Sequence, residues 1–300
     1  MVYESIIEAT EGFNSKYCIG VGGSASVYKA ELQTGQVVAV KKLHQSENGG
    51  TANLKAFTSE INALTEVRHR NIVRFYGYCL HSSHSFLLYE FLERGSLVKM
   101  LRNKATAIEL DWGTRVNIIK GVADALCYLH SECFPPLIHR DITSNNILLD
   151  DKCMAYISDF GTSRILKPNS SNWTAFVGTF GYSAPELAYT MEANEKCDVY
   201  SFGVVTLEVI MGRHPGDLIS SMSSVAAHQI LFKDFIDQRV PPPTDQLAEE
   251  MINAARLAFA CLNASPLSRP SMQQVSQQLS KLKPVPSCRQ FHTVPLKQLI

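Results

Sequence analysis

The chain has 300 residues, of which 45% are hydrophobic and 19% are charged. This composition argues against global disorder, and the length allows a sizeable core. Because 28 Lys and Arg residues balance 28 Asp and Glu residues, the net charge is zero, and we expect no general binding to nucleic acid. The eight cysteines include no C-x-x-C pair, which disfavours a zinc site and a small disulfide scaffold. No apolar run has the length of a membrane span, so we expect none in this chain.

The first part of the chain has mainly strand-like patterns. Runs of this kind cover residues 17–19, 26–32, 36–43, 72–79 and 86–92. Between them, apolar residues spaced by three and four predict one helix over 55–67. Segment 93–96 has the character of a linker.

Beyond residue 96 helical patterns dominate. Apolar stripes mark helices within 116–129, 247–262 and 272–282, and segment 198–211 is apolar nearly all round, which is typical of a central buried helix. Residues 284–300 contain three prolines and predict an irregular tail. We therefore expect an α+β protein with a small sheet-rich lobe containing one helix and a larger helical lobe.

A glycine-rich segment, Gly-Val-Gly-Gly-Ser-Ala-Ser-Val at 20–27, lies between two predicted strands. Its backbone amides could approach phosphate oxygens without interference from side chains. The chain continues as a strand, whereas a dinucleotide fingerprint needs a helix there, and a Walker loop needs Gly-Lys-Ser/Thr. Taken alone, the segment is also compatible with a simple turn.

Lys41 ends the run Val-Ala-Val-Lys on the third predicted strand. Side chains alternate along a strand, so Lys41 shares a face with the apolar Ala39. Glu60 lies on the apolar side of the following helix, where an unpaired carboxylate would be costly. A Lys41–Glu60 pair satisfies both residues; for Lys41 alone, a surface position at a strand edge is the alternative.

Three further motifs follow in order: His139-Arg140-Asp141 with Asn146 five residues later, then Asp159-Phe160-Gly161, then Ala184-Pro185-Glu186. With the glycine-rich segment, Lys41 and Glu60, this set resembles the signature of eukaryotic protein kinases. Segments 13–29, 68–73, 88–91 and 178–183 resemble, more narrowly, the cytoplasmic kinase domain of plant leucine-rich-repeat receptor-like kinases.

The resemblance implies a bilobal protein-kinase fold over residues 14–283. The N-lobe would cover about 14–89, the hinge about 90–95 and the C-lobe about 96–283. A juxtamembrane-like segment, 1–13, would precede this domain, and a C-terminal tail, 284–300, would follow it. The location would be cytoplasmic, or the cytoplasmic face of the plasma membrane if the chain is part of a longer receptor.

The same resemblance implies ATP and Mg²⁺ as cofactors and assigns the catalytic roles. Asp141 would accept or orient the proton of the substrate hydroxyl, and Lys41, oriented by Glu60, would hold the α- and β-phosphates. Asp159 and Asn146 would bind magnesium ions, because such oxygen donors suit this metal. The ATP-binding residues would be Gly20, Val21, Gly22, Gly23, Ser24, Val27, Ala39, Lys41, Tyr89, Glu90, Leu92, Leu148 and Asp159.

Structural and regulatory roles complete this assignment. The structural residues would be His139, Phe160, Glu186, Asp198 and Arg269, with Asp198 supporting the catalytic loop and Arg269 pairing with Glu186. The regulatory residues would be Arg140, Ser170, Ser171, Thr174 and Thr179. A phosphate within 170–174, with Thr174 as first choice, would bind Arg140 and order the activation segment, 159–186. Thr179 would contact the catalytic loop, as in serine/threonine kinases.

Two positions depart from the kinase pattern. Ala25 replaces the third glycine of the loop, and Thr143 replaces a lysine that many serine/threonine kinases carry two residues after the catalytic aspartate. Loss of that cation would slow transfer, so a pseudokinase that binds ATP as a signalling scaffold remains the alternative to an active serine/threonine kinase. The expected partners are protein substrates and receptor or co-receptor kinases.

Overall fold

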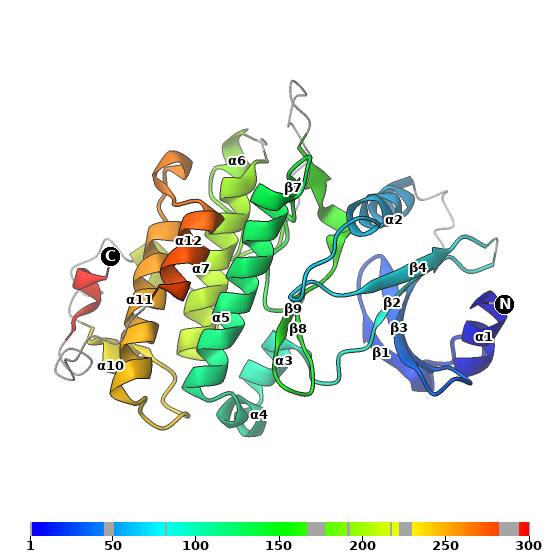
Figure 1. Cartoon of the computed structure of the whole chain (residues 1–300), viewed down its shortest axis with the longest axis horizontal. Coiled ribbons are helices and arrows are strands. Elements are labelled where there is room, and N and C mark those ends of the chain that lie inside the picture. Colours follow the sequence, from blue (N-terminus) through cyan, green and yellow to red (C-terminus); the bar gives the residue numbers. More distant parts are fainter. Residues whose placement is uncertain are drawn as a thin grey trace.

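A five-stranded antiparallel sheet forms the core of the N-terminal lobe in the computed structural model (Figure 1). Its strands follow the order β1-β2-β3-β5-β4. Their bounds are Cys18–Val21, Ala25–Glu31, Val37–Leu43, Phe75–Cys79 and Phe86–Glu90 for β1 to β5. The structure describes residues 2–44, 51–81, 83–166, 178–190, 193–216, 218–221, 230–281 and 294–299.

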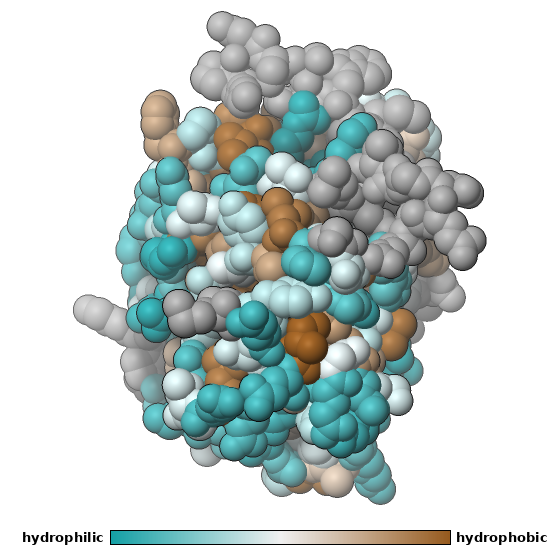
Figure 2. All heavy atoms as spheres, turned by 90° about the vertical axis from the view of Figure 1, so that its right-hand side faces the viewer, coloured by the Kyte–Doolittle hydropathy of each residue, from teal (hydrophilic) through white to brown (hydrophobic). Residues whose placement is uncertain are grey.

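The two faces of this sheet pack against different partners. Val38 and Val40 of β3 are buried on one face, together with Ile6 of helix α1 (Val2–Ala9) and Phe13. Helix α2 (Thr51–Leu64) lies on the opposite face, where Phe57 is buried. A short 3₁₀ helix over Ser15–Tyr17 connects α1 to β1. Figure 2 views the molecule from the side of the N-terminal lobe, on the right in Figure 1, and shows a mostly hydrophilic surface with scattered hydrophobic patches.

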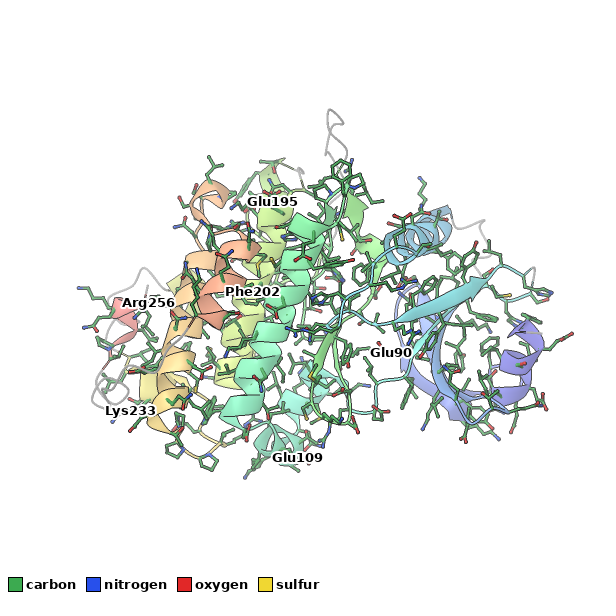
Figure 3. The ribbon with its side chains drawn as sticks, viewed as in Figure 1. Glu90, Glu109, Glu195, Phe202, Lys233 and Arg256 are labelled. Carbon is green, nitrogen blue, oxygen red and sulfur yellow. The ribbon has the colours of Figure 1, made fainter. Side chains whose placement is uncertain are left out.

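The C-terminal lobe is built from helices that lie side by side (Figure 1). Its long helices are α5 (Trp112–Cys127), α7 (Glu195–Met211), α11 (Asp245–Cys261) and α12 (Met272–Ser280). Every residue of α7 from Cys197 to Ile210 is buried, and Figure 3 shows Phe202 of this helix among the packed helices. The side chain of Asn194 caps the first turn of α7, and Gly212 ends the helix with a left-handed φ of 69°.

Shorter elements surround this bundle. The helices are α3 (Leu97–Arg102), α4 (Lys104–Glu109), α6 (Leu187–Thr190), α8 (Leu218–Ser221) and α10 (Phe232–Phe235), with a π turn over Tyr128–Glu132 and 3₁₀ turns over Phe160–Thr162, Pro266–Ser268 and Leu296–Gln298.

Two small sheets hold the loops between the lobes. Strands β6 (Gly95–Ser96), β8 (Ile147–Leu149) and β9 (Ala155–Ile157) form the first, and β7 (Leu137–Ile138) pairs with β10 (Arg164–Ile165) in the second. The segment 139–146 thus runs from β7 to β8, and Asp159 follows β9 directly. Both are fixed at the C-lobe edge that faces the N-lobe sheet.

The predicted α+β architecture with two lobes is confirmed, while several boundaries differ. The helix predicted over 55–67 spans Thr51–Leu64, and the strand predicted from residue 72 begins at Phe75. Ile72 instead forms an isolated bridge with Ile157 of β9, because the segment between α2 and β4 packs on the C-lobe before the chain enters the N-lobe sheet. None of the described helices is long and apolar enough to cross a membrane.

The last described residues, 294–299, belong to the expected irregular tail and pack against the helical lobe. Leu231 and Pro295 form an antiparallel bridge, and the side chains of Val294, Leu296 and Leu299 are buried. These apolar side chains pack against the helical bundle, and their burial stabilises this segment although it has little regular structure. The sequence did not predict this packing of residues 294–299, whose regular structure is one 3₁₀ turn over Leu296–Gln298.

Candidate active site

Lys41 lies at the centre of a charged cluster between the lobes. It sits on β3, opposite Val27 of β2 and Leu87 of β5, and its side chain is only 15% exposed. The Nζ atom donates to Glu60 Oε2 and to Asp159 Oδ1, both at 2.8 Å. One ammonium group thus joins helix α2 of the N-lobe to the segment after β9 of the C-lobe.

The charges of this cluster support one another. Burial alone would lower the pKa of Lys41, but the carboxylates of Glu60 and Asp159 outweigh burial and raise this pKa above its ordinary value. Burial alone would likewise raise the pKa of the Asp159 carboxyl, and the Lys41 charge outweighs it, so that this pKa is lowered. Lys41 therefore stays cationic and Asp159 anionic, which suits binding of phosphates and of a metal ion.

Tyr89 is the second donor to Glu60, beside Lys41. Its hydroxyl, at the inner end of β5, donates to Glu60 Oε1 at 2.6 Å. Burial and the Glu60 charge raise the pKa of Tyr89 well above its ordinary value, so the phenol keeps its proton. Since Glu60 is almost fully buried, the two donors replace the water that its carboxylate has lost. The resemblance placed Tyr89 among the expected ATP-binding residues but did not predict this hydrogen bond.

Asp141 is held by two side chains. Thr179 Oγ1 donates to its Oδ1 at 2.7 Å, and Asn146 Nδ2 donates to its Oδ2 at 2.8 Å and to its backbone carbonyl at 2.9 Å. The carboxylate thus has a fixed orientation at the start of the loop before β8. Thr179 contacts the catalytic loop here through the aspartate itself.

The loop that carries Asp141 is anchored to helix α7. Asp198 is fully buried and accepts hydrogen bonds from the backbone N–H groups of His139, at 2.8 Å, and of Arg140, at 2.7 Å. His130 Nε2 lies 2.9 Å from the same carboxylate. These contacts hold Arg140 in a left-handed conformation with φ of 73°, which a residue other than glycine adopts only when its surroundings impose it. No local pattern predicted the role of His130, because this residue lies 68 positions from Asp198 in the chain.

His139 and Phe160 join the two loops of the site. The His139 ring is buried, and its Nε2 donates to the Ser158 carbonyl at 3.0 Å, while its Nδ1 accepts from the Asp141 N–H at 3.3 Å. The Phe160 ring packs edge-on against it at 4.7 Å between centroids. Asp159, between Ser158 and Phe160, has a φ of 61°. Its carboxylate is thus placed between the half-buried Ser158 and the fully buried Phe160.

The residues expected to hold Mg²⁺ fit that ion. Both nitrogen protons of the Asn146 amide face Asp141, so the amide oxygen is turned elsewhere. Asp159 uses Oδ1 for Lys41, and the Ser158 N–H donates to the Asn146 carbonyl at 2.8 Å, which brings the two loops together. One carboxylate and one amide oxygen, with the rest of the shell left to water and phosphate, is a donor set that Mg²⁺ accepts.

The expected adenine site lies where the two lobes meet. Val27, Ala39 and Leu148 are half-buried apolar residues contributed by both lobes. Figure 3 shows Glu90 at this junction, at the end of β5. The Glu90 N–H donates to the Arg74 carbonyl at 3.0 Å, so the contribution of Glu90 to a nucleotide would come from its carbonyl. The Leu92 N–H donates to no carbonyl within the described part of the chain.

The glycine segment forms the β1–β2 hairpin: Gly20 and Val21 pair with Val27 and Ser26, and Gly22, Gly23 and Ser24 form its tip. The Gly22 N–H donates to the Ala25 carbonyl at 2.8 Å. Ala25 is buried, which explains how a methyl group is accommodated at the third glycine position.

Thr143 is also buried, and its hydroxyl accepts from the Asn146 N–H at 3.3 Å. The residue that replaces the expected lysine therefore supports the loop instead of facing substrate.

The expected ion pair between Arg269 and Glu186 is present, whereas only part of the expected regulatory residues lies in the described part of the chain. Arg269 forms a two-pronged ion pair with Glu186, at 2.6 and 2.7 Å. Arg140 is half-buried near Arg164 of β10, and burial together with the Arg164 charge lowers the pKa of Arg140. Ser170, Ser171 and Thr174 lie outside the described residues.

Comparisons with known proteins agree with this geometry. Residues 13–279 match the family model described as "Protein kinase domain". The chain is 51% identical over 282 residues to MDIS1-interacting receptor like kinase 2 of Arabidopsis thaliana, covering 93% of this chain and 27% of the relative. A probable leucine-rich repeat receptor-like protein kinase of Arabidopsis thaliana is 48% identical, over 93% of this chain and 25% of the relative.

A third relative comes from rice. The LRR receptor-like serine/threonine-protein kinase SIK1 of Oryza sativa subsp. japonica is 37% identical, over 99% of this chain and 30% of the relative. The chain thus spans only between a quarter and a third of the length of these curated relatives.

Proposed function

The chain belongs to the protein kinase family, and from this premise we propose that it transfers the γ-phosphate of ATP to Ser and Thr hydroxyls of protein substrates. The observation that carries the proposal is the Lys41 cluster beside the fixed Asp141. Lys41 reaches Glu60 and Asp159 at 2.8 Å, and Thr179 and Asn146 orient the Asp141 carboxylate. These are the groups that position phosphates and a hydroxyl nucleophile in phosphoryl transfer.

Each group has a separate task in this mechanism. Lys41 binds the α- and β-phosphates, and Glu60 keeps its ammonium group in place. Asp141 accepts the proton of the substrate hydroxyl as the hydroxyl oxygen attacks the γ-phosphorus. The bond between the γ-phosphorus and the oxygen that bridges it to the β-phosphate breaks, and ADP leaves with that oxygen. Asn146 and Asp159 would hold Mg²⁺, which would neutralise part of the phosphate charge.

The intact cluster favours transfer over the alternative of an ATP-binding scaffold. A scaffold usually lacks one of Lys41, Asp141 and Asp159, and here all three lie in hydrogen-bonded positions. Thr143 removes one cation from the substrate side, so we expect transfer without the help that a lysine there would give.

Regulation by phosphate is part of the proposal. Arg140 and Arg164 lie near each other, and burial together with the charge of Arg164 lowers the pKa of Arg140. A phosphate on Thr174, or on Ser170 or Ser171, would compensate this repulsion and order the activation segment. We further propose that the chain acts in receptor-like kinase signalling at the cytoplasmic face of the plasma membrane, with receptor or co-receptor kinases as partners, because its relatives are named receptor-like kinases.

The test is transfer of labelled phosphate from ATP to a generic protein substrate. Asp141→Asn should lower turnover by about two to four decades, a typical loss for a general base or orienting group. An amide at this position can still accept from Asn146 and donate to Thr179, so the variant should stay folded and bind ATP. Equal turnover of the wild type and Asp141→Asn would contradict the role of Asp141. If the wild type transfers no phosphate even when its activation segment is phosphorylated, the ATP-binding scaffold would be favoured.

A further inference from the structure

The tip of the glycine loop is held by a side chain from outside the loop. His44 follows β3 directly, and its backbone N–H donates to the Ser24 carbonyl at 2.9 Å. Its ring contacts the tip at two more places: Nδ1 lies 3.3 Å from the Gly23 carbonyl oxygen, and Nε2 lies 2.8 Å from Ser26 Oγ. One residue thus contacts three residues of the loop, Gly23, Ser24 and Ser26.

These contacts define how the ring hydrogen bonds. A carbonyl oxygen only accepts, so Nδ1 carries a proton and donates to Gly23. In the neutral imidazole Nε2 is then the acceptor, and the Ser26 hydroxyl, which is nearly buried, donates to it. Each ring nitrogen is therefore matched with a group of opposite character.

The loop has little else to hold its tip. A methyl group placed on Gly20 or Gly23 would meet nothing within 4 Å, so the tip is open on these sides. Glycine-rich backbone has high conformational freedom, and ordering it upon nucleotide binding costs free energy. Contacts that order the loop in the nucleotide-free protein remove part of this cost before binding.

We propose that His44 is a positioning residue that orders the phosphate-binding loop and so strengthens ATP binding. This inference rests on the proposed function only for the identity of the nucleotide. The hydrogen bonds of His44 reach the loop backbone at Gly23 and Ser24, while the catalytic groups Asp141 and Asp159 belong to the other lobe. Loss of the ring should therefore change the KM for ATP and leave kcat nearly unchanged.

The kinetic experiment compares His44→Ala, His44→Asn and Ser26→Ala with the wild type, using MgATP and a generic protein substrate. His44→Ala should raise the KM for ATP about threefold to tenfold, as expected from one or two neutral hydrogen bonds. His44→Asn keeps a nitrogen donor near the Nδ1 position and should recover part of the effect. Gln36→Ala, an exposed change just before β3, is the control and should match the wild type.

A second measurement needs no activity. Amide hydrogen exchange of residues 22–26 in the nucleotide-free protein should be faster in His44→Ala than in Gln36→Ala. Unchanged exchange, or an unchanged KM for ATP in a wild-type background that transfers phosphate, would overturn the inference. Faster exchange in a chain whose wild type neither binds nor uses ATP would keep the role of His44 in the loop and refute the proposed function instead.

Discussion

At the scale of single residues, the buried Glu60 shows how the site tolerates a carboxylate. Its Oε1 accepts from Tyr89, its Oε2 accepts from Lys41, and its side chain is 3% exposed. Removing either donor leaves a buried charge with fewer partners, which costs more than the hydrogen bond is worth. Tyr89 therefore supports helix α2 through Glu60, in addition to the proposed role in nucleotide binding.

Tyr89→Phe tests that dual role. The change keeps the ring and removes the hydroxyl, so the free energy of unfolding should fall by about 1.5–3 kcal/mol, the range for a hydrogen bond to a charged group. Urea unfolding measures the loss. Tyr76→Phe, at a side chain that is 42% exposed, is the matched control and should cost almost nothing. Equal stabilities of the two variants would contradict the role of the hydroxyl.

At the scale of elements, α7 acts as the base on which the catalytic loop rests. Its buried Asp198 binds two consecutive loop amides, and the helix itself is packed on all sides. Burial alone would raise the pKa of Asp198, but the hydrogen bond and charge of His130, with the loop amides, outweigh it and lower this pKa below 3.8. The folded state therefore binds this proton more weakly than the unfolded chain.

The pH dependence of stability follows from this lowered pKa. The contribution of Asp198 is fully present well above pH 3.8 and is lost as the pH falls below that value toward the lowered pKa. Asp198→Asn places an amide nitrogen against backbone N–H donors and should cost about 3 kcal/mol at pH 7. In urea unfolding, the difference in the free energy of unfolding between this variant and the wild type should become smaller as the pH drops from 5 to 3. A constant gap, equal to that of the exposed control Asp151→Asn, would refute this account.

How far the sequence predicts these elements depends on the range of the interactions. Strand alternation and helical spacing are local, so they predicted that Lys41 faces Glu60 and that the segment of α7 is a central helix. The contacts of His130, Tyr89 and His44 join residues far apart in the chain, and no local spacing encodes them. Helix α1 was missed because it is short and is stabilised by burial of Ile6 against the sheet, not by capping signals.

At the scale of the whole molecule, Lys41 and Asp159 link the two lobes through one ion pair. MgATP would bind to residues of both lobes, so its binding energy should add to the stability of the entire chain. At 100 times its Kd the ligand should stabilise the fold by about 2.7 kcal/mol, or raise Tm by roughly 4 °C for a chain of 300 residues.

Thermal unfolding with MgATP, with ATP and EDTA, and without ligand measures this coupling. Asp159→Asn should lose most of the increment that depends on magnesium, whereas Asp151→Asn should keep it. Increments of the same size in both variants would exclude Asp159 as a metal ligand.

The left-handed backbone at Asp159 has a consequence for the evolution of this chain. Aspartate, asparagine and glycine are the residues that adopt a φ near 61° most readily, whereas β-branched residues are strongly disfavoured there. Asparagine and glycine are each one nucleotide change away from aspartate in the genetic code. Asparagine and glycine are thus both easily reached by mutation and accepted by the backbone, and both remove the carboxylate. The path from an enzyme to a catalytically silent descendant is therefore short, and folding does not block it.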